Sequence, residues 1–188
     1  MRIISGSFKG KKLFQPKDKN TRPLKDLTKE SIFNIIKHSK KFKIDFSNSL
    51  ILDLFSGVGS FGIECLSRGV KKVIFIENYE KVLPILAKNL LNLKSIKNFE
   101  IINKDIYLSN IFAKLEYQFD IIFLDPPYND NKLELLLDKI KKKNILKDDG
   151  IIIIHRHKKD NNNISSNFHV IKEKIYGISK IIFLGNSN

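Results

Sequence analysis

The chain has 188 residues, of which 42% are hydrophobic, which excludes a disordered polypeptide and fits one α/β domain with a small appendage. Lysine and arginine outnumber the acids by 34 to 20, and the net charge of +14 favours a nucleic-acid partner, although a lysine-rich genome would give the same excess. A single cysteine, Cys65, excludes a disulfide framework. No apolar run is long enough for a signal peptide or a membrane span, so we expect a cytoplasmic protein.

The first forty residues predict an extension to the main domain, with the boundary between residues 1–40 and 41–188. In chain order they predict a hairpin (2–15), a polar loop (16–25), a helix (26–37) and the start of a basic loop (38–48). Asp26 or Thr28 could cap the helix, since both precede its apolar part.

From residue 50 onward the pattern changes to alternating strands and helices. Strands are predicted over 50–55, 71–77, 99–105, 119–125 and 150–155, helices over 59–69, 79–91 and 131–143, and two antiparallel strands over 168–177 and 179–185. This alternation implies right-handed crossovers and a mostly parallel sheet of seven strands with helices on both faces. Ligands of such sheets bind outside the carboxyl ends of the strands.

A glycine-rich turn follows the first strand, in the sequence Asp53-Leu-Phe-Ser-Gly57-Val-Gly59-Ser-Phe-Gly62. The glycines allow a tight turn and a close approach of ligand to backbone, and the next helix points its N-terminal amides at the ligand. Asp53 would repel a phosphate and suits a ligand that carries an amino group and a sulfonium. A purely structural turn is the alternative.

Two further acids end the next two strands. Glu77 stands where an acid accepts hydrogen bonds from both ribose hydroxyls of a nucleotide. Asp105 could accept from an adenine amino group, although alone it is better explained as a turn or cap residue. Acids at three successive strand ends together favour a cofactor site.

The fourth strand ends in FDIIFLDPPYND, residues 119–130, where two prolines stop the strand behind an acid. This arrangement suits an exocyclic amine of a nucleobase, a poor nucleophile because its lone pair is delocalised. Asp125 can accept one N–H and the carbonyl of Pro126 the other, which stabilises the positive charge that develops on nitrogen. Rigid prolines position these acceptors, and Tyr128 offers a face for stacking. The alternative is a simple turn with a surface tyrosine.

Together, Asp53 to Gly62, Glu77, Asp105 and Asp125 to Tyr128 resemble the motif set of class I S-adenosylmethionine-dependent methyltransferases, which implies a Rossmann-like fold. RIISGSFKGKKL and TRPLKDLTKESIFNII (21–36) resemble the opening of the RsmD family, bacterial enzymes that methylate N2 of one guanine in 16S ribosomal RNA. The resemblance extends from Arg2 to the closing strands. It implies that the chain acts on 16S rRNA. The small N-terminal extension favours an assembled or assembling 30S subunit as the substrate, and we expect a monomer. Methyl transfer from a sulfonium needs no metal.

The resemblance also implies a role for each matching residue. The cofactor, S-adenosyl-L-methionine, would contact Asp53, Phe55, Gly57, Gly59, Glu77, Asn78, Asp105, Ile106 and Asp125. The catalytic set would be Asp125, Pro126, Pro127 and Tyr128. RNA would contact Arg22, Thr28 and Asn34 of the N-terminal motif, which also includes Glu30, and Lys9, Lys11 and Lys12 are placed to meet phosphates. Taken alone, each of these lysines is better explained as a solvated charge than as an essential contact.

One departure and several alternatives stay open. Relatives often carry an acid after the fifth strand, where this chain has His155-Arg156-His157, which could place basic charge near RNA. The two histidines could bind a metal, but no third ligand is evident. The substrate amine could instead be adenine N6 or a glutamine, or the chain could be an RNA-binding module without catalysis. Asp53 and the DPPY sequence disfavour a nicotinamide dehydrogenase.

Overall fold

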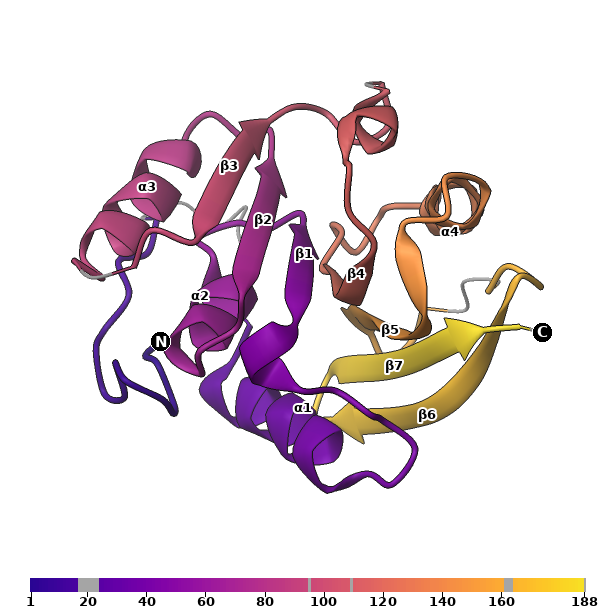
Figure 1. Cartoon of the computed structure of the whole chain (residues 1–188), viewed down its shortest axis with the longest axis horizontal. Coiled ribbons are helices and arrows are strands. Elements are labelled where there is room, and N and C mark those ends of the chain that lie inside the picture. Colours follow the sequence, from indigo (N-terminus) through magenta and orange to yellow (C-terminus); the bar gives the residue numbers. More distant parts are fainter. Residues whose placement is uncertain (17–23, 95, 109, 161–163, 188) are drawn as a thin grey trace.

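The computed structural model describes residues 1–16, 24–94, 96–108, 110–160 and 164–187 (Figure 1). Within them lies a seven-stranded sheet in the order β3-β2-β1-β4-β5-β7-β6. The strands are β1 (Leu50–Leu54), β2 (Lys72–Glu77), β3 (Phe99–Asn103), β4 (Phe119–Leu124), β5 (Leu146–His157), β6 (Phe168–Tyr176) and β7 (Ser179–Asn186). The first five pair in parallel, and β7 pairs antiparallel with β5 and β6.

Helices cover both faces of this sheet, as the sequence predicted. They are α1 (Asp26–His38), α2 (Ser60–Ser67), α3 (Leu83–Leu91) and α4 (Leu133–Lys142), with short 3-10 helices η1 (Phe46–Asn48) and η2 (Ile111–Lys114). Because successive side chains of a strand point to opposite faces, neighbouring residues enter different cores. Ile51 packs with residues of α1, α2 and α3, whereas Leu52 packs with residues of α4 and η2.

The strand order reverses between β1 and β4, since the chain runs outward from β1 through β2 to β3 and then returns to β4 on the other side of β1. At such a switch point the loops after the two central strands diverge and leave a crevice at their carboxyl ends. The sheet therefore directs the segments after β1 and β4 to one shared crevice.

Several predicted boundaries shift for local reasons. Helix α3 begins at Leu83 rather than at residue 79, with Pro84 in its first turn, where a missing N–H does no harm. The predicted side-chain cap of α1 is wrong: Lys25 is the N-cap, and no side chain among the described residues caps the helix. The Asp26 carboxylate instead accepts a hydrogen bond from the backbone N–H of Arg2.

Across the described residues, none of the helices combines the length and the apolarity that a bilayer crossing needs.

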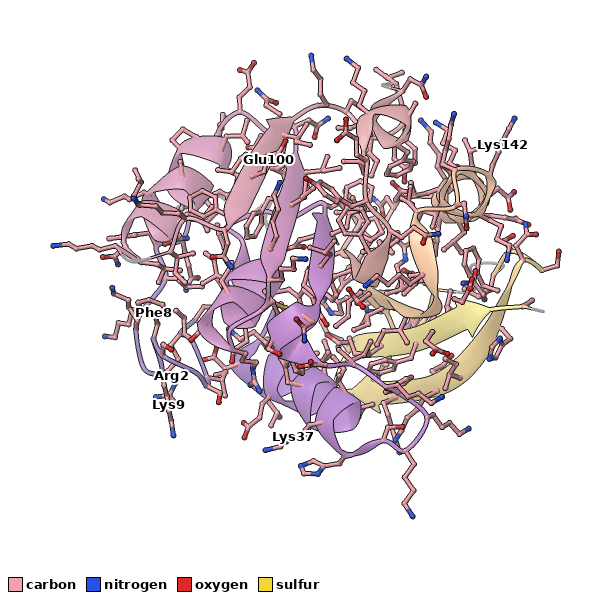
Figure 2. All side chains as sticks on the ribbon, viewed as in Figure 1. Arg2, Phe8, Lys9, Lys37, Glu100 and Lys142 are labelled. Atoms are coloured by element: carbon pink, nitrogen blue, oxygen red, sulfur yellow. The ribbon has the colours of Figure 1, made fainter. Side chains whose placement is uncertain are left out.

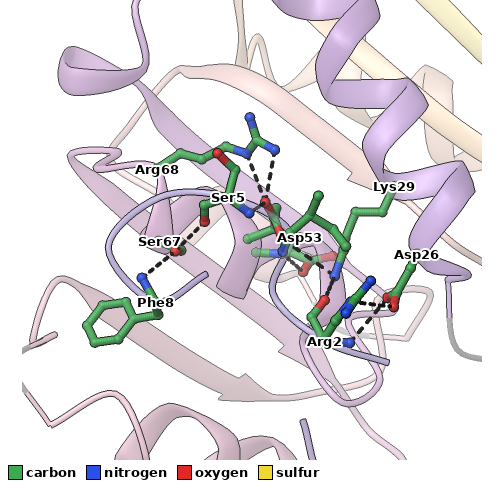
Figure 3. Close-up of polar contacts among 11 residues, drawn as sticks. Arg2, Ser5, Phe8, Asp26, Lys29, Asp53, Ser67 and Arg68 are labelled. Atoms are coloured by element: carbon green, nitrogen blue, oxygen red, sulfur yellow. Dashed lines mark hydrogen bonds and ion pairs between the residues drawn. The ribbon is translucent and has the colours of Figure 1, made fainter. Parts of the chain in front are cut away.

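The N-terminal segment lies antiparallel to itself, but it pairs through a single bridge, Arg2 with Lys12, rather than as two strands. It docks on α2 through Glu64, which is fully buried. Figure 3 shows Ser5, Lys29 and Arg68, which all belong to this network of polar contacts. The Glu64 carboxylate accepts hydrogen bonds from the backbone N–H groups of Ile4, at 2.7 Å, and Ser5, at 2.9 Å. Arg68 and Lys29 form ion pairs with the same carboxylate at 2.9 Å and 3.6 Å. Glu64 thus joins the N-terminal segment, α1 and α2.

Candidate active site

A cavity of about 470 Å³ opens at the carboxyl ends of β1, β2 and β4. It is lined by nine of the residues that the sequence marked for cofactor binding or catalysis: Asp53, Phe55, Gly57, Glu77, Asn78, Asp125, Pro126, Pro127 and Tyr128. The N-terminal segment reaches it through Pro16 and Leu24, and β5 reaches it through His155. Residues far apart in sequence therefore meet in the crevice that the strand order creates.

Glu77 holds the glycine turn (residues 55–59) in place from the end of β2. One carboxylate oxygen accepts from the backbone N–H of Gly57 at 2.7 Å, and the other accepts from Asn78 and Tyr79, both at 2.9 Å. The turn needs this support because Phe55 adopts a left-handed φ of 56°, a conformation that costs a bulky residue about 1–3 kcal/mol. The wall of the cavity is thus preorganised by an acid that itself lines the cavity.

Asp53 is the most buried acid of the site, with 1% of its surface exposed. Its Oδ2 accepts a hydrogen bond from the backbone N–H of Gly62 at 2.9 Å, in the first turn of α2. Its Oδ1 is buried and accepts no hydrogen bond from the residues that the structure describes. Burial raises the pKa of this carboxyl well above its usual range, and the charges of Asp125 and Glu77 raise it further. The arrangement fits a cationic ligand with N–H donors, which would complete the coordination of Oδ1.

Asp53→Asn is expected to raise the melting temperature of the ligand-free protein at pH 7.5 by about 2–4 °C, the shift that 1 kcal/mol produces in a chain of this size. Because the folded-state pKa is raised, the folded protein holds a proton that the unfolded chain releases, so the stability of the native protein falls as pH rises above about 3.9. Asp53→Asn lacks this loss of stability, so its higher melting temperature should disappear as pH falls towards about 3.9. Thermal unfolding at several pH values measures the difference.

Asp45→Asn is the matched control, because hydrogen bonds from Ser47 and then Asn48 lower the pKa of the Asp45 carboxyl. The sign is therefore opposite, and this variant should be less stable than the native protein at neutral pH. If both variants changed the melting temperature equally, the destabilising charge could not be assigned to Asp53.

Gly62 allows the backbone of α2 to approach β1 and β2 closely. A Cβ at this position would lie 2.3 Å from Cε1 of Phe75 and 2.9 Å from Oδ2 of Asp53. We therefore expect Gly62→Ala to destabilise the fold by about 2–3 kcal/mol through overpacking, measured by urea unfolding. In Gly57→Ala the new Cβ meets no atom of the described residues within 4 Å, so the loss of stability should be only the left-handed penalty of about 1 kcal/mol. If Gly62→Ala and Gly57→Ala lost equal stability, overpacking at position 62 would not explain the loss.

The DPPY loop (residues 125–130) is held by Arg156, a side chain that is 2% exposed. Its guanidinium donates to the carbonyls of Pro127 at 2.8 Å, Tyr128 at 3.2 Å and Asp130 at 2.8 Å. Its Nε forms an ion pair with Asp160 at 3.1 Å. The carbonyl of Pro127 is therefore occupied. That of Pro126 receives no hydrogen bond from the described residues and stays available to a ligand.

The role of His155-Arg156-His157 was the part that the sequence left open. The idea that it places basic charge near RNA is wrong for Arg156, because the guanidinium is buried against the DPPY loop. His155 lies 2.9 Å from the Asp125 carboxylate, and the rings of His157 and Tyr128 lie in a T-shaped arrangement with centroids 5.3 Å apart. In the part of the chain that the structure describes, no group of three histidine, cysteine or acidic residues is arranged to hold a metal ion.

Three residues predicted to bind the cofactor lie outside the lining. Asp105 accepts from the backbone N–H groups of Tyr107 at 2.7 Å and Leu108 at 3.2 Å, so it caps a turn. It also accepts from the side-chain amide of Asn78, at 3.2 Å, which places it beside the cavity. Ile106 is buried in the core under α4, and Gly59 is the N-cap of α2 with a φ of 83°.

The residues predicted to meet RNA are dispersed. Arg22 lies outside the described residues, Thr28 is buried, and Asn34 and Glu30 are exposed on α1. Lys9 and Lys12 are exposed, and Figure 2 shows Lys9 projecting away from the N-terminal segment. Lys11 instead donates to the carbonyl of Asn92. The described members of this set do not line the cavity.

Asn89, which the sequence did not mark, couples the N-terminal segment to the glycine turn. It is fully buried, and its amide donates to the carbonyls of Phe14 at 3.1 Å and Val58 at 3.0 Å. Its oxygen accepts from the backbone N–H of Phe14 at 2.8 Å. A shift of the N-terminal segment at Phe14 would therefore disturb the hydrogen bonds of Asn89, which also contacts the glycine turn at Val58.

Known proteins resemble this chain over nearly its whole length. The family model described as conserved hypothetical protein 95 matches residues 1–185. Ribosomal RNA small subunit methyltransferase D of Haemophilus influenzae is 35% identical over 95% of this chain and 90% of its own length, and its namesake in Escherichia coli is 28% identical over 94% and 85%. The solved structure of yhhF from Escherichia coli is 27% identical, has a TM-score of 0.79, and covers 100% of this chain and 98% of its own. With the strand order, these neighbours confirm the predicted Rossmann-like class I methyltransferase fold.

Proposed function

The chain belongs to the RsmD family, and on that premise we propose that it transfers a methyl group from S-adenosylmethionine to the exocyclic N2 of a guanine in 16S ribosomal RNA. The observation that carries the proposal is the position of Asp125. Its side chain lines the same cavity as Asp53 and Glu77, so an acceptor for a base amine stands next to acceptors for a nucleoside cofactor.

The residues of the cavity fit such a cofactor. Asp53 would accept from its amino group, because Oδ1 is buried without a partner among the described residues. Glu77 would accept from a ribose hydroxyl with the lone pair of Oε2 that its three backbone contacts leave over. Gly57 offers an open approach, since no atom of the described residues lies within 4 Å of where its Cβ would be. S-adenosylmethionine would supply an electrophilic methyl group at its sulfonium.

The DPPY loop provides the acceptors for the target base. Asp125 and the carbonyl of Pro126 would each accept one N–H of the guanine amino group, which favours pyramidal nitrogen and stabilises its developing positive charge. Tyr128 would stack on the base. Transfer is in line and needs no covalent enzyme intermediate. The amine loses its proton to water after transfer, so the value of Asp125 lies in orientation and electrostatics.

The RNA partner is supported by the net charge of +14 and by exposed lysines such as Lys9 and Lys12. In this proposal the N-terminal residues 1–40 form the RNA and cofactor entrance, and the substrate is an assembled or assembling 30S subunit bound by a monomer. Pro16 and Leu24 support an entrance role, because both line the cavity.

Methyl transfer from labelled S-adenosylmethionine tests the proposal. Unmodified 30S subunits, protein-free 16S rRNA and duplex DNA are offered in parallel, and the labelled product is digested to nucleosides. We expect label in the 30S sample, as N2-methylguanosine. Label as N6-methyladenine, or label in DNA alone, would overturn the assigned substrate and keep the amine chemistry. An absence of label with the cofactor bound would favour a binding module.

A further inference from the structure

His155 is the middle member of a hydrogen-bonded series that runs from the cavity into the core. Its Nδ1 lies 2.9 Å from Oδ1 of Asp125, and its Nε2 lies 2.9 Å from Oγ of Ser179. His155 and Ser179 are only 4% and 5% exposed. Strand β5 supplies the histidine and β7 supplies the serine, so the Asp125 carboxylate is anchored from the interior of the sheet.

The chemistry of the three groups determines which of them donates. An ionised carboxylate only accepts, so the ring nitrogen that faces Asp125 carries the hydrogen. A serine hydroxyl can donate or accept, so Ser179 can pair with Nε2 of His155 whether or not that nitrogen carries a hydrogen. The ring is therefore held at both ends, with a fixed N–H directed at the carboxylate.

The same three residue types occur in hydrolases whose serine is the nucleophile, but the geometry here excludes that role. Ser179 is buried on β7 and is not part of the cavity lining, whereas Asp125 is. The series thus presents its acid, not its serine, to the ligand.

We propose that His155 is a positioning residue for methyl transfer, an inference that rests on the proposed function. Its N–H fixes the rotation of the Asp125 carboxylate so that the second oxygen, Oδ2, is presented to the target amine. Within the described residues, Oδ2 accepts no hydrogen bond, and rotation about the last side-chain bond of an aspartate is otherwise only weakly restricted. The rings of His155 and Tyr128 also lie in a T-shaped arrangement, with centroids 6.2 Å apart, so His155 supports the stacking residue as well.

Three variants test this role: His155→Leu, which removes the donor; His155→Asn, whose amide can replace the Nδ1 donor; and the matched control His169→Leu on the distal strand β6. The single-turnover rate with 30S particles should fall about 100-fold in the leucine variant and about 10-fold in the asparagine variant. The control should keep the native rate. Affinity for S-adenosylhomocysteine, measured by calorimetry, should stay within about twofold throughout.

A native rate in His155→Leu, equal losses in the leucine and asparagine variants, or a parallel loss of S-adenosylhomocysteine affinity would overturn the inference. If His155→Leu does not fold, the asparagine variant and Ser179→Ala replace it. Both should then lose rate by about 10-fold without loss of cofactor-product affinity, and native rates in both would overturn the inference.

Failure of the proposed function gives a different result, namely no label in 16S rRNA with the native protein. The orientation of Asp125 can then be followed without substrate, through the ¹³C resonance of its carboxyl carbon. This resonance should shift in His155→Leu and not in His169→Leu. An unchanged resonance in both would overturn the role of His155 by itself.

Discussion

Asp125→Ala is expected to lower methyl transfer to 30S particles by about 10²–10³-fold, the loss typical of removing one preorganised group that stabilises developing charge. The carboxylate lines the cavity and is held by His155. In the proposed mechanism its removal leaves the target amine with one acceptor instead of two. Affinity for S-adenosylhomocysteine should change little, because Asp53 and Glu77 remain. Single-turnover rates and calorimetry separate the two effects.

Asp120→Ala is the matched control, since Asp120 lies near the opposite end of the same strand β4. Its carboxylate accepts from the backbone N–H of Leu50 at 2.8 Å and pairs with Lys147 at 2.9 Å, remote from the cavity lining. This variant should lose some stability and keep its rate of transfer. If both variants lost activity equally, Asp125 would have no special role, and destabilisation of β4 would explain the result.

Arg156→Met is expected to reduce both stability and activity. It removes the donors to three carbonyls of the DPPY loop and leaves Asp160 without its ion-pair partner. Breaking a buried pair in this way destabilises by about 3 kcal/mol, which corresponds to a fall in melting temperature of about 6–12 °C. The freed loop should also misplace Asp125 and Tyr128, and a positional error of this kind can lower the rate by about 100-fold.

Arg68→Met controls for the loss of an arginine as such. Arg68 pairs with Glu64 at 2.9 Å and covers the ring of Phe33 at 4.1 Å, but it is not part of the cavity lining. At a temperature where all proteins are folded, its rate should stay within about twofold of the native rate. A similar loss of rate in both variants would mean that Arg156 acts through global stability and not through the loop.

The fold was predictable because each element carries its own local signal. The alternation of apolar strands and amphipathic helices from residue 50 onward is a short-range pattern, and the chirality of parallel crossovers leaves few topologies. The gathering of Asp53, Glu77 and Asp125 follows directly, since the carboxyl ends of parallel strands share one edge of the sheet. The bounds of β5 were less predictable, because the length of this strand depends on its pairing with β4 and β7.

The roles of His155 and Arg156 could not be predicted, because they depend on which side chains β5 places under the DPPY loop. The available signal was three polar residues ending an apolar run, which is unusual for a central strand. The capping of α1 was misjudged for a similar reason. The Asp26 carboxylate accepts a hydrogen bond from the backbone N–H of Arg2, which lies 24 residues earlier in the sequence. Lys11 likewise contacts a backbone carbonyl of Asn92, a contact that no local pattern encodes.

The position of β1 between β2 and β4 has a consequence for biosynthesis. Leu54 of β1 pairs with Leu124 of β4, about 70 residues later in the chain. At roughly 5–20 residues per second, a ribosome takes about 3–15 s to make the intervening segment. During that time β1 can pair with β2, but the backbone N–H and C=O groups of its other edge stay unpaired on a strand with mostly apolar side chains. Nascent chains of this protein should therefore depend on a holding chaperone until β4 emerges, and ribosome-stalled chains that end before residue 119 should aggregate once released.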